Sequence, residues 1–568
     1  MMLPILVACL ALAALAAGYV FYSRYLAAVL FRLRSDEPVP ALEFQDGVDH
    51  VPTPRGVLWG HHFSSIAGAA PILGPAMAIV WGWLPALIWI VVGVIFMGAA
   101  HDFGALVLSV RHGGQTVGNL AERYISPRAR VLFLLVIFFL IWLVGAVFAF
   151  AIAGLFTKFP ASILPVNLEI LVAVCLGVWG YKWKRALLWP SLAVLMGLYL
   201  VIFGSASGSI PVPQEGSLLL SLDFWLVGLM IYAFIASSLP VWVLLQPRDL
   251  INSHQLVVGL VALYLGFFLA APEFHAPLVG EISNLPAVFP LLFVTIACGA
   301  ISGFHGLVSS GTTSKQLACM TDARPIGYGA MLVEASLAIL ATMAVACGLW
   351  GGADHTHAFD FLSATIHSNA VEGRLPLPQV GQALMAFVHG AAGFLQSLGI
   401  PMAVGQTVIA VLVISFAATS LDTALRIQRL VLAELGAVYR VRALSNRWLA
   451  GALAAGSVLL LIYADYEQGA KSLWPVFGAT NQVLAGFTLA ICALYLRSMG
   501  RRSWAFGVPA VIVMAITFTA MAVQIARDFR AEKWLVTSVG AAVAVLATFI
   551  ALESALAWRR APKARERA

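Results

Sequence analysis

Charged side chains are scarce in this sequence of 568 residues. Asp, Glu, Lys and Arg together make up 10% of the chain, whereas hydrophobic residues make up 61%. A soluble globular domain carries about 25% charged residues, and no polar stretch here exceeds about 35 residues. The composition therefore excludes an ordinary soluble domain and indicates a protein that lies largely within a lipid bilayer.

Cysteine is also scarce, and its spacing fits neither a disulfide framework nor a metal site. We interpret the cysteines as small buried hydrophobic residues, and the sequence predicts neither a bound metal nor another cofactor. The six cysteines, all in or beside apolar segments, are Cys9, Cys175, Cys298, Cys319, Cys347 and Cys492.

Two further absences exclude classes of protein. No GxxxxGK[ST] motif is present, which argues against transport driven by ATP bound to this chain. Residues 3–22 lack the basic start of a signal peptide, so we expect a retained first helix. The net charge of +7 comes mainly from Lys and Arg in short loops between apolar runs, so we reject a nucleic-acid partner and expect the lipid bilayer instead.

Long apolar runs recur from one end of the chain to the other. Each has roughly the 20 residues that a helix needs to cross a bilayer, and the runs are continuous, which excludes a barrel of alternating strands. We predict an all-α polytopic membrane protein with about fifteen transmembrane helices. The predicted crossings are 3–22, 57–80, 84–110, 131–156, 167–181, 186–206, 223–246, 255–271, 288–311, 327–349, 401–424, 447–463, 472–496, 504–525 and 534–556.

Basic loops set the predicted orientation. In this count most Lys- and Arg-rich loops, such as "KWKR" and "KQLACMTDAR", fall on one side, which is normally the cytoplasm. The N-terminus is then outside and the C-terminus inside, although the basic "RDFRAEK" is left outside. The apolar segment 379–398 is predicted to be a re-entrant or surface helix, because a full crossing there would move the basic loop 426–447 outside.

Three crossings are interrupted by Gly, Pro or polar residues. One interruption, "GAISGFHGLVSSGTTSKQ" (299–316), lies in the ninth crossing, which would face the first broken helix in an inverted repeat. The two strongest interruptions are "GHHFSSIAGAAPILGP" in the second crossing and "IASSLPVWVLLQPRD" in the seventh. Non-helical backbone at membrane depth must line protein or water, so both stretches are candidates for a substrate site. They are five crossings apart and run in opposite directions, as an inverted repeat of five plus five helices requires. The predicted regions are residues 1–54 (N-terminal helix and basic loop), 55–207 and 222–425 (the two repeats), 446–558 (four further helices) and 559–568 (a basic cytoplasmic tail).

The predicted substrate-binding residues lie in these two interruptions. They are Gly60, His61, His62, Ser64, Ser65 and Gly68 in the first, and Ala236, Ser237 and Ser238 in the second. The two histidines would point about 100° apart on a regular helix, so they would face one cavity only where the helix is unwound. An imidazole there could hydrogen-bond a carboxylate or accept a proton. The alternative is a pair of structural histidines.

A second group of residues is predicted to couple transport to an ion. Ionisable side chains within the membrane usually face a cavity or a partner, which makes His101, Asp102 and Glu334 candidates for carrying a proton. His305 is a further ionisable residue within a predicted crossing. The hydroxyls of Ser309, Ser310, Thr312 and Thr313 in the ninth crossing could hold a cation instead, or these small residues could serve helix packing. Asp422 and Arg426 lie one turn apart, which favours an ion pair within one helix.

A set of stretches spread over most of the chain resembles the carbon starvation protein A (CstA) family, of which this chain looks like a shorter member. They are "GHHFSSIAGAAPILGPAMA", "GWLPALIWIVVGVIFMGAAHDF", "FIASSLPVWVLLQPRD", "GAISGFHGLVSSGTTSKQ", "DARPIGYGAMLVEA", "SFAATSLDTALRIQRLVLAEL" and "LWPVFGATNQVLAG". The resemblance implies a transporter of the amino acid–polyamine–organocation superfamily, in the bacterial inner membrane, with a LeuT-like inverted repeat. Carried over by position, Gly60–Pro75 and Ala236–Pro240 would be the paired discontinuous elements, and the Ser309–Thr313 cluster would take the place where sodium-coupled relatives often bind an ion.

The function that this resemblance implies is secondary active import of short peptides or pyruvate-like small carboxylates, used in carbon starvation. We expect coupling to protons, with sodium as an alternative, and the sequence leaves the oligomeric state open. Two other classes stay possible. One is a membrane nutrient sensor that binds the same solute without net transport, and the other is a haem or metal oxidoreductase that uses intramembrane histidines.

Overall fold

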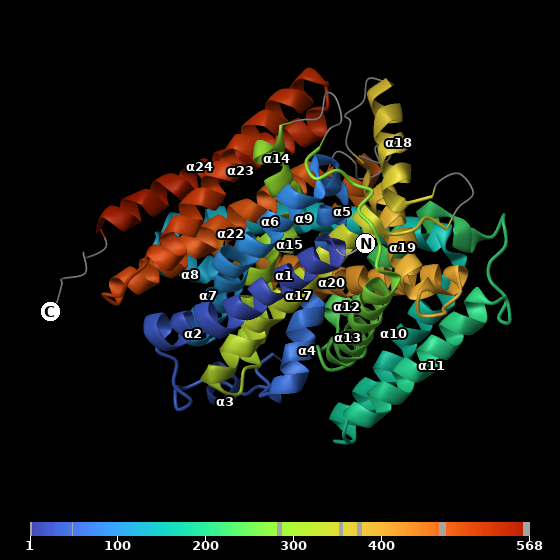
Figure 1. The fold of residues 1–568 in the computed structure, drawn as a ribbon. Helices are drawn as coiled ribbons and strands as arrows, with labels where there is room; N and C mark the ends of the chain where they lie inside the picture. Colours follow the sequence, from blue (N-terminus) through green and yellow to red (C-terminus); the bar gives the residue numbers. More distant parts are fainter. Residues whose placement is uncertain are drawn as a thin grey trace.

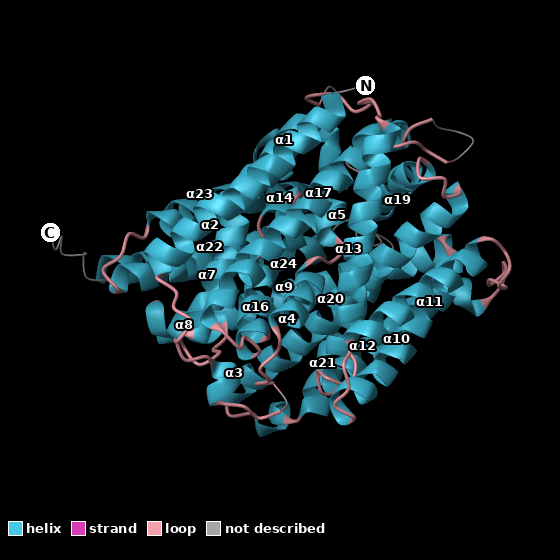
Figure 2. Cartoon of the chain, turned by 60° about the horizontal axis from the view of Figure 1, so that its bottom comes forward, coloured by secondary structure: helices cyan, strands magenta, loops and turns pink. Residues whose placement is uncertain are grey.

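The computed structural model describes residues 3–47, 49–280, 287–351, 356–371, 378–464 and 473–560. Within these residues the secondary structure is helical, with isolated bridges but no strand (Figure 2). The α-helices are α1 (Leu3–Ala17), α2 (Ser23–Tyr25), α3 (Pro40–Glu43), α4 (Arg55–Ile66), α5 (Ala70–Ala78), α6 (Trp83–Gly93), α7 (Ala99–Val110), α8 (Val117–Tyr124), α9 (Pro127–Lys158), α10 (Ile163–Gly177), α11 (Leu188–Ala206), α12 (Leu222–Ser238), α13 (Leu245–Ala270), α14 (Val288–Thr295), α15 (Ala297–Ala300), α16 (Gly303–Gly311), α17 (Ala330–Cys347), α18 (Ala358–Val371), α19 (Val380–Gln396), α20 (Met402–Val438), α21 (Arg447–Ala464), α22 (Leu473–Ser498), α23 (Trp504–Arg530) and α24 (Trp534–Arg560).

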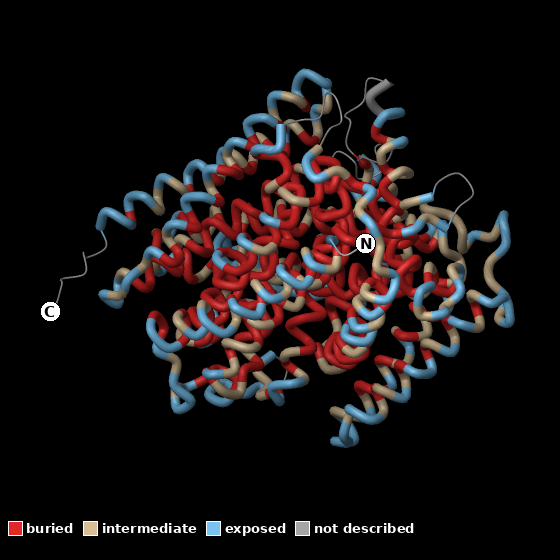
Figure 3. Tube along the Cα trace, viewed as in Figure 1, coloured by how far each residue is buried: buried red, intermediate tan, exposed pale blue. Residues whose placement is uncertain are grey.

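The buried and exposed helices are clearly separated. Buried residues fill the middle of the bundle, while α11 and α24 lie at opposite edges and expose much of their length (Figures 1 and 3). Their exposed residues include Leu200 on α11 and Phe549 on α24. Bands of large exposed apolar side chains on long helices indicate contact with lipid.

The helix lengths establish a multi-pass membrane protein. Among the described residues, 12 helices are long and apolar enough to cross a membrane, and the bent pair Arg55–Ile66 and Ala70–Trp81 makes a possible 13th. Two further predicted crossings, 223–246 and 288–311, correspond to α12, which has only 17 residues, and to the pieces α14, α15 and α16. The total of about fifteen stays a prediction.

The predicted re-entrant segment forms α19. This helix begins with a reciprocal capping box between Gln379 and Gln382, and most of its residues are buried. It packs against α5, α17 and α20 inside the bundle. Whether it crosses the whole membrane stays a prediction.

The first predicted break is present, but it begins after the histidines. α4 is helical through Ile66, and Ala67 then takes φ −76° and ψ 58° while the Gly68 N–H donates to the Ile66 carbonyl at 2.8 Å. This geometry is an inverse γ-turn. Pro71 occupies the first turn of α5, and the two helices meet at a bend of 44°. The helix is therefore interrupted between α4 and α5, at Ala67–Ala69.

The second predicted break is also present. Leu239–Leu244 separates the two helices α12 and α13, and Asp249 near the start of α13 contacts α4. α5 itself packs against α14 and α15, and the chain after α15 is extended at Ile301 and Ser302 before α16 begins. The interruption of the ninth predicted crossing therefore lies beside the first break. The pairing of the second and seventh crossings in an inverted repeat, with the repeats 55–207 and 222–425, stays a prediction.

Candidate substrate and proton site

The two histidines of α4 contact different neighbours. His61 Nδ1 contacts the Asp249 carboxylate on α13, and His62 Nδ1 lies 2.9 Å from Thr313 Oγ1 in the turn that follows α16. α4 is helical at both positions and the two rings diverge, so the unwinding that would let them face one cavity is not present there. A role of the two histidines in binding stays a prediction. Both histidines are fully buried, so α4 joins α13 to the α16 region through them.

The other predicted residues of the first interruption lie where α4 and α5 meet α13 and α20. The Ser64 hydroxyl donates to the Asp249 carbonyl at 3.0 Å, and the Ser65 carbonyl accepts from the Ser420 hydroxyl at 3.5 Å. The glycines allow this close approach: an ideal Cβ on Gly60 would lie 2.8 Å from Ser253 Oγ, and one on Gly68 would lie 2.5 Å from Ser420 Oγ.

The predicted residues at the end of α12 form a separate group. The hydroxyls of Ser237 and Ser238 donate to the Phe234 carbonyl at 3.0 Å and 2.9 Å. The Ala236 carbonyl accepts from Arg426 on α20 at 3.3 Å. These contacts are made with α12 itself and with α20, not with α4. A role of Ala236–Ser238 in binding stays a prediction.

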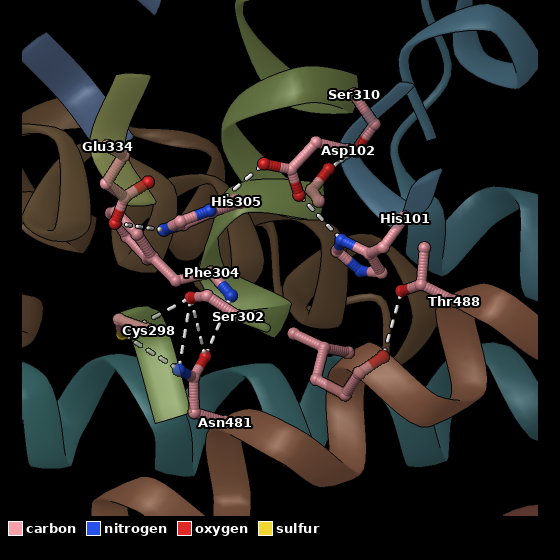
Figure 4. A network of polar contacts seen from close by, with 12 residues as sticks. His101, Asp102, Cys298, Ser302, Phe304, His305, Ser310, Glu334, Asn481 and Thr488 are labelled. Atoms are coloured by element: carbon pink, nitrogen blue, oxygen red, sulfur yellow. Dashed lines mark hydrogen bonds and ion pairs between the residues drawn. The ribbon is translucent and has the colours of Figure 1, made fainter. Parts of the chain in front are cut away.

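Four buried titratable side chains form a continuous chain across three helices (Figure 4). His101 Nδ1 lies 2.7 Å from Asp102 Oδ1, and His305 Nδ1 lies 3.0 Å from Asp102 Oδ2. The other nitrogen of the His305 ring, Nε2, lies 3.5 Å from Glu334 Oε1. All four side chains have 0% exposure. The structure thus brings together His101, Asp102 and Glu334, and places His305 at the centre.

Local irregularities in the backbone position this chain. The π-helical turn Val94–Gly98 precedes α7, and another, Arg324–Gly329, precedes α17. Such turns free main-chain groups and are frequent at functional sites. The Tyr328 hydroxyl of the second turn donates to the Ile95 carbonyl of the first at 2.8 Å, which fixes α7 against α17.

Most hydroxyls of the predicted cation cluster are already used. The Ser310 hydroxyl donates to the Gly306 carbonyl at 2.7 Å, and the Thr312 hydroxyl donates to the Val308 carbonyl at 2.9 Å. Thr313 pairs with His62. Among the described residues only Ser309 Oγ of this set has no hydrogen-bond partner. Within the part of the chain that the structure describes, no group of three or more His, Cys, Asp and Glu side chains could hold a metal ion.

A protein-family model matches most of the chain. Residues 3–520 match the family model described as carbon starvation protein CstA. The chain belongs to the CstA family.

Curated relatives of this CstA-family chain are named as transporters. The peptide transporter CstA of Mycobacterium tuberculosis (strain ATCC 25618 / H37Rv) is 33% identical, over 89% of this chain and 73% of the relative. The peptide transporter CstA of Escherichia coli (strain K12) is 33% identical, over 89% and 78%. The pyruvate/proton symporter BtsT of the same organism is 31% identical, over 89% and 80%. These names support a membrane transporter and are consistent with a protein that is not an enzyme.

Solved structures resemble the chain only distantly. MhsT in complex with L-phenylalanine has a TM-score of 0.42 and 13% identity, over 83% of this chain and 99% of that chain.

The sequence predictions missed the polar partners on α10 and α13 of this CstA-family chain. Arg248 Nη1 lies 2.7 Å from Asp422 Oδ2, and Arg248 Nε lies 3.3 Å from Glu169 Oε1. The predicted pair of Asp422 with Arg426 is therefore wrong, since Arg426 donates instead to main-chain carbonyls at the end of α12. Arg248 and Asp249 stand in the quoted stretch "FIASSLPVWVLLQPRD", and two adjacent ionisable residues in an apolar chain were the signal that could have found them.

Proposed function

We propose that this chain is a proton-coupled importer of a small carboxylate or a short peptide in the bacterial inner membrane, with its N-terminus outside and its C-terminus in the cytoplasm. The relatives supply the two substrate classes, because they are named a peptide transporter and a pyruvate/proton symporter. Both classes carry a carboxylate. A role in carbon starvation follows from the family description.

The observation that carries the proposal is the buried chain His101–Asp102–His305–Glu334. Ionisable groups at membrane depth are costly and commonly mark proton relays. His305 presents one ring nitrogen to each carboxyl group, so a proton taken up on one side of the imidazole can be matched by release on the other. Sodium is the weaker alternative, because most hydroxyls of the Ser309–Thr313 set are engaged.

The proton relay lies against the first helix break. α16, which carries His305, packs against α4, whose last residue is Ile66. The backbone is non-helical directly after Ile66 and again at Ile301–Ser302, just before α16. We place the substrate between these two breaks, where the positive ends of the helix dipoles of α5 and α16 favour an anionic group.

Uptake into proteoliposomes tests the proposal. With an acidic exterior, we expect labelled pyruvate or a labelled dipeptide to accumulate above equilibrium, and a protonophore to abolish the accumulation. Asp102→Asn removes the carboxylate between the two histidines, so it is expected to abolish accumulation while exchange of internal for external substrate continues. Asp322→Asn is the control, because Asp322 lies near the surface with only a 3.9 Å contact to Arg55.

Two results would contradict the proposal. One is accumulation by the wild type that a protonophore does not change. The other is an Asp102→Asn variant that accumulates substrate as well as the wild type does.

A further inference from the structure

A second buried ionic cluster lies on the side of α13 and shares no residue with the proton relay. Arg248 on α13 contacts Glu169 of α10 and Asp422 of α20. The Tyr232 hydroxyl of α12 donates to Asp422 Oδ2 at 2.6 Å, and the Ser415 hydroxyl donates to Glu169 Oε2 at 2.7 Å. Each of the three charged side chains is 1% exposed. We call these five residues the Arg248 cluster.

A cavity adjoins this cluster at Tyr232. It has a volume of about 550 Å³ and lies between α9, α10, α12 and α20, and residues 211–213 of the loop after α11 also line it. Its walls are mainly apolar, and Tyr232 and Asn167 are among the few polar side chains that line it. Ile414 and Ala418 line the cavity on α20, while Ser415 and Asp422 of the same helix belong to the cluster. Tyr232 belongs to both: its side chain lines the cavity, and its hydroxyl accepts a hydrogen bond from Arg248 Nη1 at 2.5 Å.

The cluster holds more negative than positive charge. Two carboxylates face one guanidinium, so one negative charge is left without a counter-charge. Two further charged groups are in electrostatic range, but Asp249 is paired with His61, and Arg426 donates to the carbonyls of Ala236 and Leu239. Asp422 Oδ1 and Arg248 Nη2 have no hydrogen-bond partner among the described residues. A buried, uncompensated charge is costly, so the cluster is built to accept one proton.

We propose that Arg248 binds the carboxylate of the transported solute after Asp422 has taken up a proton. Protonation of Asp422 weakens its ion pair with the guanidinium, and the solute carboxylate then takes that position on Arg248 while Glu169 keeps its own. The ligand class is a small monocarboxylate with an apolar body, because the cavity walls are apolar. This inference rests on the proposed function. It adds a second binding position for the solute, apart from the one between the two helix breaks, and assigns part of the proton coupling to it.

The exchange leaves the charge of the site unchanged. Before it, the cluster carries one positive and two negative charges; afterwards it carries one positive charge, the Glu169 carboxylate and the solute carboxylate, with Asp422 neutral. One proton therefore enters with each monocarboxylate, and the membrane potential does no work on this step. An electroneutral exchange avoids the cost of adding a net charge at membrane depth.

Binding to the purified full-length protein tests the site. The probes are pyruvate, the dipeptide Ala-Ala and its C-terminal amide, each titrated at pH 6 and pH 8 by isothermal calorimetry. For the wild type we expect a carboxylate probe to bind more tightly at pH 6, by up to about tenfold per pH unit for one linked proton, and the amide not to bind. Which of pyruvate and Ala-Ala binds identifies the source of the carboxylate.

Variants separate the roles of the two partners. Asp422→Asn mimics the protonated acid with almost the same shape, so its affinity should equal the wild-type value at pH 6 and no longer depend on pH. Arg248→Gln should lower the affinity at least tenfold at both pH values. Glu122→Gln, at a surface pair with Arg130, is the control and should behave as the wild type.

The outcomes also separate this inference from the proposed function. Asp422→Asn keeping the wild-type pH dependence, Arg248→Gln keeping the wild-type affinity, or the amide binding as well as the acid would each overturn the inference. Should Arg248→Gln not fold, Asp422→Asn decides alone. If wild-type proteoliposomes accumulate solute under a pH gradient while Asp422→Asn remains fully coupled, only the inference fails. If the wild type accumulates nothing, the proposed function fails.

Discussion

Gly74 shows how a single missing side chain determines the packing beside the first break. An ideal Cβ at this position would lie 2.7 Å from the Thr295 carbonyl oxygen and 2.9 Å from the Ile296 Cα. Both neighbours are main-chain atoms, so they cannot move aside as a flexible side chain would. α5 can approach α14 and α15 this closely because position 74 is glycine.

We predict that Gly74→Ala destabilises the protein and reduces transport. The added methyl group overpacks a buried contact, which typically costs about 1–3 kcal/mol. Gly197→Ala on α11 is a matched control, since an added Cβ there meets nothing within 4 Å; it should be neutral or slightly stabilising because Ala favours helix over Gly. Thermal unfolding in detergent and uptake in proteoliposomes measure both. Equal melting temperatures for the two variants would contradict this account.

At the scale of helices, the extended break between α15 and α16 depends on a distant side chain. Asn481 of α22 accepts from the Phe304 N–H at 2.9 Å, and its amide lies 3.1 Å from both Cys298 Sγ and Ser302 Oγ. Figure 4 shows these contacts around the break, beside the proton relay. The side-chain oxygen of Asn481 thus gives the Phe304 N–H an acceptor in place of the main-chain carbonyl that a continuous helix would supply.

Removing this amide should loosen the break. Asn481→Ala leaves the Phe304 N–H without its buried acceptor, at an expected cost of about 1–3 kcal/mol. Asn446→Ala is the control, because Asn446 bonds the N–H groups of Trp448 and Leu449 at the surface, where water can replace it. Hydrogen exchange of residues 301–311 should accelerate in Asn481→Ala only. Unchanged exchange there would show that the break does not depend on Asn481.

An element could be predicted from the sequence when the interactions that form it join residues close together in the chain. The long helices were predicted because the apolar length of a crossing is written locally, and the first break was predicted because Gly68 and Pro71 stand at it. The glycines of the stretch 299–316 marked an interruption there, but they did not show that Ile301 and Ser302 would be the extended residues, because the side chain that contacts this turn, Asn481, is distant in the sequence. The Arg248 cluster likewise joins three helices far apart in the sequence, so the local spacing of Asp422 and Arg426 suggested the wrong ion pair.

At the scale of the whole molecule, the orientation in the membrane is open to a direct test. Cys319 is partly exposed in the stretch "KQLACMTDAR", which the basic loops predict to be cytoplasmic. We expect a membrane-impermeant maleimide to label it in inside-out vesicles but not in right-side-out vesicles. Ser207→Cys, in the predicted outer loop after α11, should show the reverse, and Cys319→Ser gives the background. Labelling of Cys319 from the outside would invert the proposed orientation.

The long helix α20 has a mechanical consequence. Its residues Ser415, Asp422 and Arg426 contact α10, α13 and the end of α12, respectively, while α9 lies along much of its length. A rotation of α20 about its own axis, against α9, would change its contacts with all three neighbours at once. Replacement of Asp422 by the solute carboxylate on Arg248 would break the contact with α13 and leave the contacts of Ser415 and Arg426 in place. Binding of a solute at Arg248 would therefore change how far α20 can move relative to α10, α12 and α13.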